Sequence, residues 1–376
     1  MKVLHIVTSL EQGGAQAVLF RLTTAGSSRV NHEIISLTDD GFYGPKLRAA
    51  DVPVQSIGLG RGSISIPAIV SLYRAIKKSD PDLIQTWMYH ADLVGGVVAR
   101  FAGVGNVIWG IRNSDLSTRG SKLTTRLVAR LCALLSALIP KAIVSCSQSG
   151  RAIHQALGYQ SDRFYVIPNG FDTEVFAPKP HSRAHLRQEL GLGEKEKVLG
   201  MVARWDSQKD FPNLLAAMRI VWARYPEVRL LLAGSGILAT NKELITLIQG
   251  ADGEARTLLL GPLEDVPKLM NCIDVLVLSS RFGEAFPNVI GEAMACGTPC
   301  VVTDVGDSAH VVGQAGWVVP PAQPKELAAR IEEALEQVSG SSGRQRAEAC
   351  RERIRTLFHV EIMREKFEEV WRSNAS

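Results

Sequence analysis

Short apolar runs alternate along the whole chain with segments in which apolar residues recur at helical spacing. The apolar runs are nearly unbroken, which is typical of strands buried on both faces of a parallel sheet. In the first half they cover residues 2–9, 32–37, 83–88, 106–111 and 142–147, the last being the final strand expected there. In the second half they cover residues 197–202, 228–233, 258–261, 273–278 and 300–305. This order predicts an α/β protein with two doubly wound parallel sheets.

The segments between the strands predict helices and loops. Helical spacing is found over residues 15–24, 66–78, 93–101, 122–141, 149–157, 213–224, 266–271, 324–338 and 347–371. Polar stretches at 41–45, 178–196 and 339–346 are expected to be loops. The turn-forming Pro-Asn-Gly within residues 166–172 marks the domain boundary. We therefore expect one domain over residues 1–172 and another over 173–354.

A β-loop-α-β unit over residues 273–305 is the most informative stretch. Pro287 suits the first turn of a helix, and Gly297 with Pro299 suits its end. The N–H groups near residues 286–289 then form an anion site at the helix start. Glu284 precedes this site and Glu292 follows it, so the two carboxylates can grip hydroxyls on either side of a bound phosphate. Taken alone, two such glutamates are more often an ordinary loop acid and a solvated helix residue.

Further candidates for phosphate contact follow two other predicted strands. Arg204 and Lys209 come after residues 197–202 and can flank one diphosphate, although two exposed cations are also common on any surface. Gly13 and Gly14 follow the first strand, where glycines let backbone amides approach a ligand or simply form a tight turn. Gly234 begins a Gly-Ser-Gly loop of the same close-approach kind.

The letters around these residues resemble a known family. The segment EAFPNVIGEAMACGTP at 284–299 resembles the E-x7-E signature of the family 4 retaining glycosyltransferases. The context R-W-x-x-x-K-D-F at 204–211 is similar to the phosphate-binding segment of that family, and VIPNGFDTEVF at 166–176 to its hinge. The resemblance implies the GT-B fold, with two Rossmann-like domains facing a cleft. It also implies that residues from about 355 to 376 cross back to the first domain, where Phe367, Val370 and Trp371 suit docking.

The resemblance also implies a reaction. A sugar would pass from a UDP- or GDP-sugar to an acceptor hydroxyl, giving an α-linkage, in the synthesis of a cell-surface polysaccharide or glycolipid. The departing phosphate oxygen would itself accept the proton of the acceptor, so that no protein nucleophile is needed. No D-x-D segment indicates a metal-bound diphosphate, and we expect neither a metal nor another cofactor.

The same resemblance assigns a role to each candidate. Glu284 would contact the transferred sugar, while Arg204 and Lys209 would neutralise the leaving phosphate as the other catalytic residues. Glu292 would bind the ribose hydroxyls. The remaining donor contacts would come from Gly13, Gly14, Gly234, Phe286, Pro287, Asn288 and Val289, and from Leu260 and Leu263 around the nucleotide base.

Two candidates lie at strand ends in the first half. His90 follows the strand at 83–88, where open α/β sheets bind ligands, but a lone histidine is more often structural. Arg112 stands where many members of the family have a histidine that reaches the donor sugar. Arginine favours a phosphate or carboxylate partner. A contact of Arg112 with donor or acceptor and a simple ion pair with Asp115 are both open.

Charge and composition bear on the partners. The net charge of +4 is too small to argue nucleic-acid binding. Residues 1–174 carry 18 Lys and Arg against 12 Asp and Glu, whereas the remainder carries 24 against 26. Lys122, Arg126 and Arg130 lie on one face of the predicted helix at 122–141, which favours contact with an anionic membrane surface. In the alternative interpretation, the leucines of that helix face the core and its cations face water.

Localisation follows from what the chain lacks. The six cysteines show no metal-type spacing, which fits a reducing compartment. No signal peptide precedes the first strand, and no apolar run approaches the ~20 residues of a spanning helix. We expect a cytoplasmic protein that associates peripherally with the membrane. Two rival functions stay open, a nucleotide-sugar epimerase of the same fold and a non-catalytic sugar-nucleotide-binding protein.

Overall fold

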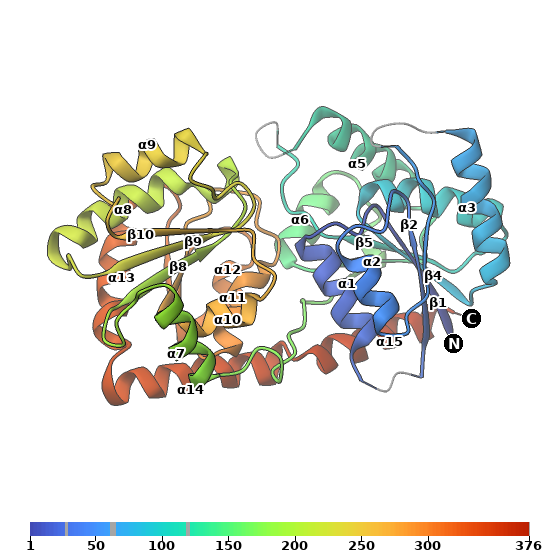
Figure 1. Ribbon diagram of the computed structural model, residues 1–376. Coiled ribbons are helices and arrows are strands. Elements are labelled where there is room, and N and C mark those ends of the chain that lie inside the picture. The colour runs from blue at the N-terminus through green and yellow to red at the C-terminus, as the bar shows by residue number, and fades with distance from the viewer. Residues whose placement is uncertain (27–28, 61–64, 118–120, 376) are drawn as a thin grey trace. The chain divides into compact units, whose positions relative to one another are not determined.

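The computed structural model describes residues 1–26, 29–60, 65–117 and 121–375, which form two compact units (Figure 1). Unit 1 comprises Met1–Gly170 and the C-terminal Val360–Ser376, and unit 2 comprises Phe171–His359. The boundaries expected at 172 and about 355 thus compare with breaks after Gly170 and His359 in the structure. Each unit has its own parallel sheet, as the alternation of strands and helices predicts.

The sheet of unit 1 has the strand order β3-β2-β1-β4-β5-β6-β7, and every neighbouring pair is parallel. The described strands are β1 Lys2–Val7, β2 Asn31–Ser36, β3 Val54–Ser56, β4 Leu83–Trp87, β5 Val107–Ile111, β6 Ala142–Ser145 and β7 Phe164–Val166. The side chains of the central strands β1, β4, β5 and β6 are buried on both faces because helices cover both sides of the sheet.

The helices of unit 1 divide between these two faces. Side chains of α1, α2 and α15 pack with Val3, Val7 and Trp87 on one face. Side chains of α3, α4 and α5 pack with Leu4, Ile6 and Trp109 on the other. The helices are α1 Gly14–Thr24, α2 Tyr43–Ala49, α3 Ile66–Ser79, α4 Gly96–Phe101, α5 Leu123–Leu135, α6 Gln148–Ala156 and α15 Val360–Asn374, with a π-helical turn at Ala91–Gly95 and a 3-10 turn at Ser161–Arg163.

The C-terminal helix α15 is an integral part of unit 1, in agreement with the expected crossing back. Phe367 and Trp371 are fully buried, and the Phe367 ring stacks on Trp87 with 5.9 Å between centroids. The indole Nε1 of Trp371 donates to Gln85 Oε1 at 3.1 Å in β4. In Figure 1 the red α15 lies beside the blue β1 and α1. The last helix therefore completes the core of the first sheet.

The sheet of unit 2 has the order β10-β9-β8-β11-β12-β13 and is also fully parallel. Its strands are β8 Val198–Val202, β9 Arg229–Ala233, β10 Thr257–Gly261, β11 Val275–Leu278, β12 Cys300–Thr303 and β13 Trp317–Val319. Its helices are α7 Pro180–Glu189, α8 Phe211–Arg224, α9 Lys242–Gly250, α10 Val266–Cys272, α11 Asn288–Ala295, α12 Ser308–Val312, α13 Pro324–Gln337 and α14 Gly340–Leu357, with 3-10 turns at Ser207–Lys209 and Gly313–Ala315.

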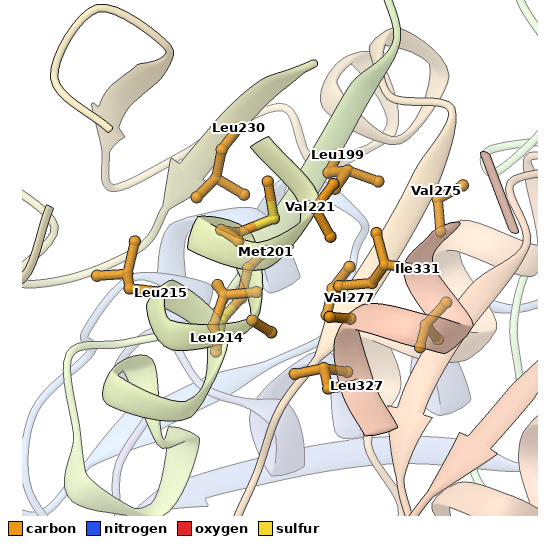
Figure 2. Close-up of a cluster of buried hydrophobic side chains, with 14 of the residues drawn as sticks. Leu199, Met201, Leu214, Leu215, Val221, Leu230, Val275, Val277, Leu327 and Ile331 are labelled. Carbon is orange, nitrogen blue, oxygen red and sulfur yellow. The ribbon is translucent and has the colours of Figure 1, made fainter. Parts of the chain in front are cut away.

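The core of unit 2 gathers on one face of its sheet (Figure 2). Leucines and valines of β8, β9 and β11 meet side chains of α8 and α13, among them Leu214, Leu327 and Ile331. Cys300 alternates with the core residue Val301 along β12, so its side chain points to the opposite face. There its Sγ lies 3.8 Å from the carbonyl oxygen of Ile290, which places α11 on that face.

Several expected loops are helices in the structure. Residues 41–45 lead into α2, which tolerates Pro45 because a proline in the first turn needs no N–H partner. Residues 180–189 of the expected polar connection form α7, whose buried Arg187 binds Asp274 and backbone carbonyls. Residues 340–346 of the third expected loop open α14.

Other boundaries also differ from expectation. The single helix expected at 347–371 is broken at Phe358, whose carbonyl accepts from Phe171 N at 2.9 Å instead of continuing the helix. The helix expected at 122–141 ends at Leu135, ahead of Pro140. Residues 142–147 do not hold the last strand of the first half, because β7 follows them. Pro287 is the N-cap of α11 and thus lies just before its first turn.

Three buried histidines bear on how the stability of unit 1 is expected to depend on pH. His5 Nδ1 accepts from Trp87 Nε1 at 3.1 Å, so His5 Nε2 must donate to His32 Nδ1 at 3.0 Å. Burial lowers the pKa of His5 well below its usual value, and it lowers the pKa of His32 and of His154 to about 4. These side chains are therefore neutral in the fold near pH 6, where the unfolded chain begins to protonate them.

We expect unit 1 to lose stability as the pH falls below about 6.5. A group whose pKa is depressed by folding binds more protons in the unfolded chain, so the unfolding free energy falls with falling pH. Each such histidine should cost about 1.4 kcal/mol per pH unit between the unfolded value near 6.5 and the lowered folded value. Hydrogen exchange followed by mass spectrometry at pH 7 and 5.5 would measure this for peptides of β1 and β4. Protection of these peptides that is unchanged after correction for intrinsic exchange would contradict the prediction.

Candidate active site

The topology of unit 2 singles out one place on its sheet. From β8 the chain runs outward through β9 and β10, then returns to the other side of β8 with β11. The loops that follow β8 and β11 therefore lead in opposite directions from adjacent strands. In open α/β sheets, ligands bind at the carboxyl ends of the strands at such a switch point. These two loops hold Arg204, Lys209 and Glu284.

Lys209 and Glu284 meet across the switch point. The Lys209 ammonium forms an ion pair with Glu284 Oε1, and the side chains are only 13 % and 7 % exposed. Ser280 Oγ donates to the same carboxylate oxygen at 2.6 Å. A charge pair buried to this degree is stable only where both partners are present and held in good geometry. The two residues are 75 positions apart in the sequence, but this ion pair holds them together and makes each depend on the other.

Hydrogen bonds to backbone carbonyl groups hold the two loops in place. Ser279 Oγ donates to the carbonyl oxygen of Lys209 at 2.8 Å, and Arg281 N donates to that of Gln208 at 2.8 Å. Thr303 Oγ1 at the end of β12 donates to the carbonyl oxygen of Ser280 at 2.6 Å. The position of the ion pair is therefore fixed by the surrounding main chain as well as by the two side chains themselves.

Arg204 lies in a different environment. Its side chain is 60 % exposed, and Nε lies 3.1 Å from Asp206 Oδ2. Its Nη2 donates to Gln208 Oε1 at 2.9 Å. The guanidinium is thus presented to solvent at the end of β8 and braced from one side. Such a group can meet a phosphate without first being taken out of a buried network.

Glycines bring neighbouring loops close to this place. Gly234 has φ +138°, and a Cβ at this residue would stand 2.1 Å from the carbonyl oxygen of Ala203. Gly306 has φ +61°, and a Cβ there would stand 1.6 Å from the carbonyl oxygen of Glu284. No other residue type can replace either one without moving a loop. Gly306 therefore sets the path of the Glu284 loop, together with the 3.0 Å bond from Asp307 N to the carbonyl oxygen of Ala285.

The start of α11 lies directly after Glu284. Pro287 caps the helix without a side-chain hydrogen bond, and Asn288 and Val289 form its first turn. The Phe286 side chain is buried, and its ring stacks on Phe171 with 6.4 Å between centroids. Any contact of Phe286 with a phosphate would consequently come from its main chain. Glu292 lies one turn further along, 9 % exposed.

The remaining donor-side candidates lie at the same edge of the sheet. Leu260 is in β10, and Leu263 follows the strand by two residues. Gly234 N donates to the carbonyl oxygen of Gly261 at 2.7 Å, which connects this strand end to the Gly234 loop. Ser280, Thr303 and Gly306 support the site but were not singled out by sequence reasoning. Their positions at the ends of predicted strands are the signal that could have found them.

Unit 1 has a switch point between β1 and β4. Gly13 caps α1 after β1, and a Cβ on it would stand 2.6 Å from Gln16 Oε1. Gly14 is the first residue of that helix. After β4, Met88 has φ +72°, an unusual value for a side chain of this size. His90 follows it, and burial lowers the pKa of its imidazole. The structure thus places Gly13, Gly14 and His90 after the two strands at whose carboxyl ends this sheet would bind a ligand.

Arg112 extends from the end of β5 over an aromatic surface. Its guanidinium carbon lies 4.4 Å from the centroid of the Trp87 ring, and Nη1 donates to Asn169 Oδ1 at 2.8 Å. The structure therefore gives Arg112 the partner Asn169 in place of Asp115, which was one of the two alternatives left open by the sequence. Nearby, Asp92 is fully buried and accepts from Thr86 Oγ1 at 2.5 Å, and burial raises the pKa of its carboxyl to about 8.

No group of three or more His, Cys, Asp and Glu side chains is arranged to hold a metal ion within the described ranges 1–26, 29–60, 65–117 and 121–375. Asp80 and Asp82 do spell D-x-D, but they precede β4 at the amino edge of the sheet. Asp82 Oδ2 accepts there from Lys2 N at 2.7 Å, at the start of β1. This pair therefore lies at the opposite edge from the loops described above.

Comparison with known proteins gives two family matches. The model described as Glycosyl transferases group 1 matches residues 182–357, and the model described as Glycosyltransferase Family 4 matches residues 12–175. The EpsF protein of Bacillus subtilis, named as a glycosyltransferase, is 26 % identical over 81 % of this chain and 79 % of its own. An Escherichia coli protein named UDP-Gal:alpha-D-GlcNAc-diphosphoundecaprenol alpha-1,3-galactosyltransferase is 27 % identical over 63 % of this chain and 62 % of its own.

A solved structure shows the same fold. The Anabaena protein Alr3699/HepE, determined in complex with UDP-glucose, is 24 % identical and has a TM-score of 0.86. The match covers 99 % of this chain and 100 % of that one. The likeness therefore extends over both units and the returning C-terminal helix.

Proposed function

Since this chain belongs to the group 1 glycosyltransferases of family 4, with the GT-B fold, we propose that it transfers a sugar with retention from a nucleotide diphosphate sugar to an acceptor hydroxyl. The observation that supports this most directly is the buried Lys209–Glu284 pair at the switch point of unit 2. It sets a cation suited to phosphate beside a carboxylate suited to sugar hydroxyls, where an α/β sheet binds its ligand.

In the proposed reaction, the bond from the anomeric carbon to the phosphate oxygen breaks and a bond to the acceptor oxygen forms on the same face. The departing phosphate oxygen takes the acceptor proton. Lys209 and Arg204 stabilise the charge that develops on the diphosphate, a contribution that is usually large in such reactions. The Lys209 ammonium has three N–H donors, so its bond to Glu284 leaves donors for phosphate oxygens. Glu284 lies beside the sugar, which gains positive charge as its bond to phosphate breaks.

Partners follow from the names of similar proteins and from the chain itself. The Escherichia coli relative is named for UDP-Gal and a lipid diphosphate acceptor, and the Anabaena structure contains UDP-glucose. We propose a UDP- or GDP-hexose as donor and a carbohydrate or lipid-linked acceptor in polysaccharide or glycolipid synthesis, on the cytoplasmic side of a membrane. No helix among the described residues is long and apolar enough to span a bilayer. Transfer is proposed to need neither a metal nor another cofactor, because Arg204 and Lys209 supply the positive charge.

A panel of nucleotide sugars tests the proposal. Purified protein is first screened for thermal stabilisation by UDP- and GDP-sugars, because a bound ligand raises stability with its occupancy. Donors that bind are then incubated with a membrane lipid extract, with and without EDTA, and products are analysed by mass spectrometry and NMR. The expected result is an α-linked product from an α-linked donor, formed equally in EDTA. A β-linked product or restoration by Mg²⁺ would contradict the mechanism. Conversion of the donor sugar without acceptor would indicate the epimerase.

The two glutamates are expected to fail differently. Glu284→Gln removes a carboxylate proposed to act on the reacting sugar, so kcat should fall by about 10²-fold with a smaller change in KM. Glu292→Gln acts on a proposed ribose contact that does not change during reaction, so the donor KM should rise about tenfold or more. Steady-state kinetics over a range of donor concentrations would measure both effects. The opposite pattern, or full activity of Glu284→Gln, would disprove this division of roles.

A further inference from the structure

Helix α5 is packed with four of its leucines turned outward. Its fully buried residues are the small Ala129, Cys132 and Ala133, and Val128 and Leu135 are partly buried against the same core. The side chains on the other side are leucines, exposed at 66 % for Leu123, 48 % for Leu127, 48 % for Leu131 and 76 % for Leu134, followed after the helix by Leu138 at 70 %. We call these five residues the leucine face. Among the leucines of α5, only Leu135 packs against the core, which corrects the alternative in which the leucines of this segment face it.

The leucine face is a continuous stripe. With about 100° of rotation per residue, the side chains of Leu123, Leu127, Leu131 and Leu134 fall within roughly 80° of one another around the helix axis. The helix lies at the periphery of unit 1 (Figure 1). Single exposed leucines are ordinary on a protein surface, but a contiguous apolar stripe marks an interaction site.

The charges beside the stripe all have one sign. Lys122, Arg126 and Arg130 follow one edge of the leucines at helical spacing, and Lys141 is exposed just beyond Leu138. The sequence contains no Asp or Glu between Asp115 and Asp162. An apolar stripe bordered by cations is the pattern of a helix that lies in a membrane interface. Cations next to such a stripe also attract anionic lipid headgroups.

We propose that the leucine face inserts into the headgroup region of a membrane that contains anionic phospholipid, with α5 parallel to the membrane plane. The leucines enter the boundary of the acyl chains, while Lys122, Arg130 and Lys141 contact phosphates. A second copy of the chain fits this surface less well. A symmetric contact through it would bring the cations of both copies together, and the segment between Asp115 and Asp162 holds no acid to neutralise them. This inference rests on the proposed function, because a membrane-bound enzyme would meet a lipid-linked acceptor at the bilayer surface. Membrane binding itself, however, needs no transfer activity.

Sedimentation with vesicles tests the proposal on the full-length protein. Vesicles of phosphatidylcholine alone are compared with vesicles of phosphatidylcholine and phosphatidylglycerol, at low and at high salt. Wild type should bind the anionic vesicles more strongly, and salt should weaken the binding. Leu127→Ser with Leu134→Ser should weaken it about tenfold or more. Lys122→Ser with Arg130→Ser should reduce the preference for anionic vesicles by about tenfold or more.

Ile66→Ser is the matched control, because Ile66 is 80 % exposed on α3 of the same unit and lies outside the leucine face. Equal loss of binding in this variant and in the leucine variant would overturn the proposal. So would wild type that ignores anionic lipid, or a concentration-dependent dimer in gel filtration that only the leucine variant abolishes. Transfer to a water-soluble acceptor, measured in the same variants, should stay unchanged. Its absence in wild type would count against the proposed function and not against membrane binding.

Discussion

Replacing Lys209 by methionine is expected to lower kcat/KM for sugar transfer by about 10²–10³-fold, the usual cost of losing a preorganised group that stabilises developing charge. Methionine keeps most of the side-chain volume, so the change removes mainly the ammonium. Arg204→Ala should have a smaller effect, because the Arg204 side chain is 60 % exposed whereas that of Lys209 is 13 % exposed. An exposed charge acts through solvent and is screened by salt. Initial rates at several donor concentrations would measure both variants.

The same substitution also affects stability, and this effect has to be separated from catalysis. Lys209→Met leaves the buried Glu284 carboxylate without its cation, which should cost about 3–5 kcal/mol in the unfolding free energy of unit 2. Adding Glu284→Gln removes the second charge and should recover much of this loss without recovering activity. Urea denaturation of the two single variants and the double variant would show the recovery.

Lys268→Met provides the control for both measurements. Lys268 is also paired with a glutamate in unit 2, with 2.8 Å between Nζ and Glu189 Oε2, but this pair lies away from the switch point on an exposed surface. Its loss should change stability by less than about 1 kcal/mol and leave transfer intact. Similar activity in the Lys209 and Lys268 variants would show that the switch-point lysine has no special role.

The strands of the two sheets were largely predictable because most of them are buried on both faces. A run such as Val275–Leu278 has no polar face, so its letters alone identify it. The strands β3, β7 and β13 each have three residues, too few to show any period. Helix α7 was missed for a different reason, since its anchor is the buried Arg187 bound to Asp274 and to carbonyl groups. Hydrophobic periodicity carries no trace of such an anchor.

The candidate site was predictable where short motifs carry it and not where distant residues meet. The motif letters single out Lys209 and Glu284 separately, but their ion pair depends on the packing of β8 beside β11. The role of Gly306 depends on the approach of another loop, which no local pattern records. Arg112 found its partner in Asn169, 57 residues away, and not in the nearby Asp115. Spacing in the sequence indicates only partners that are close along the chain, whereas the fold also brings distant residues into contact.

The same limit applies to amphipathic helices. The leucines of α5 recur at helical spacing, which shows that they share a face but not which way that face points. In α15 the apolar face points inward, and Phe367 and Trp371 are fully buried. In α5 the fully buried residues are the small Ala129, Cys132 and Ala133, while four of its leucines are exposed. Truncating a buried apolar side chain of α15 is therefore expected to lower the stability of unit 1. Truncating an exposed leucine of α5 is expected to change that stability little.

Trp371→Ala is accordingly expected to destabilise unit 1 by about 3–5 kcal/mol, the usual cost of truncating a fully buried tryptophan. The change removes the packing of the indole against Phe367, whose ring centroid lies 5.5 Å away, and against His5 at 5.7 Å. It also leaves Gln85 Oε1 without the indole donor, and an unpaired buried acceptor adds its own cost of about 1–3 kcal/mol. Because α15 covers β1 and β4, the substitution should lower the stability of the whole sheet of unit 1.

Hydrogen exchange would separate this effect from unit 2, because two units need not unfold in one step. Peptides of β1 and β4 should exchange faster in Trp371→Ala, while peptides of β8 and β11 keep their protection. Lys366→Ala on the exposed side of α15 is the control and should change neither set, since exposed positions away from special features usually contribute within about 0.5 kcal/mol. Equal loss of protection in both units would show that the helix does not act through the unit 1 core. Unchanged exchange in β1 and β4 would mean that the sheet does not depend on its C-terminal helix for stability.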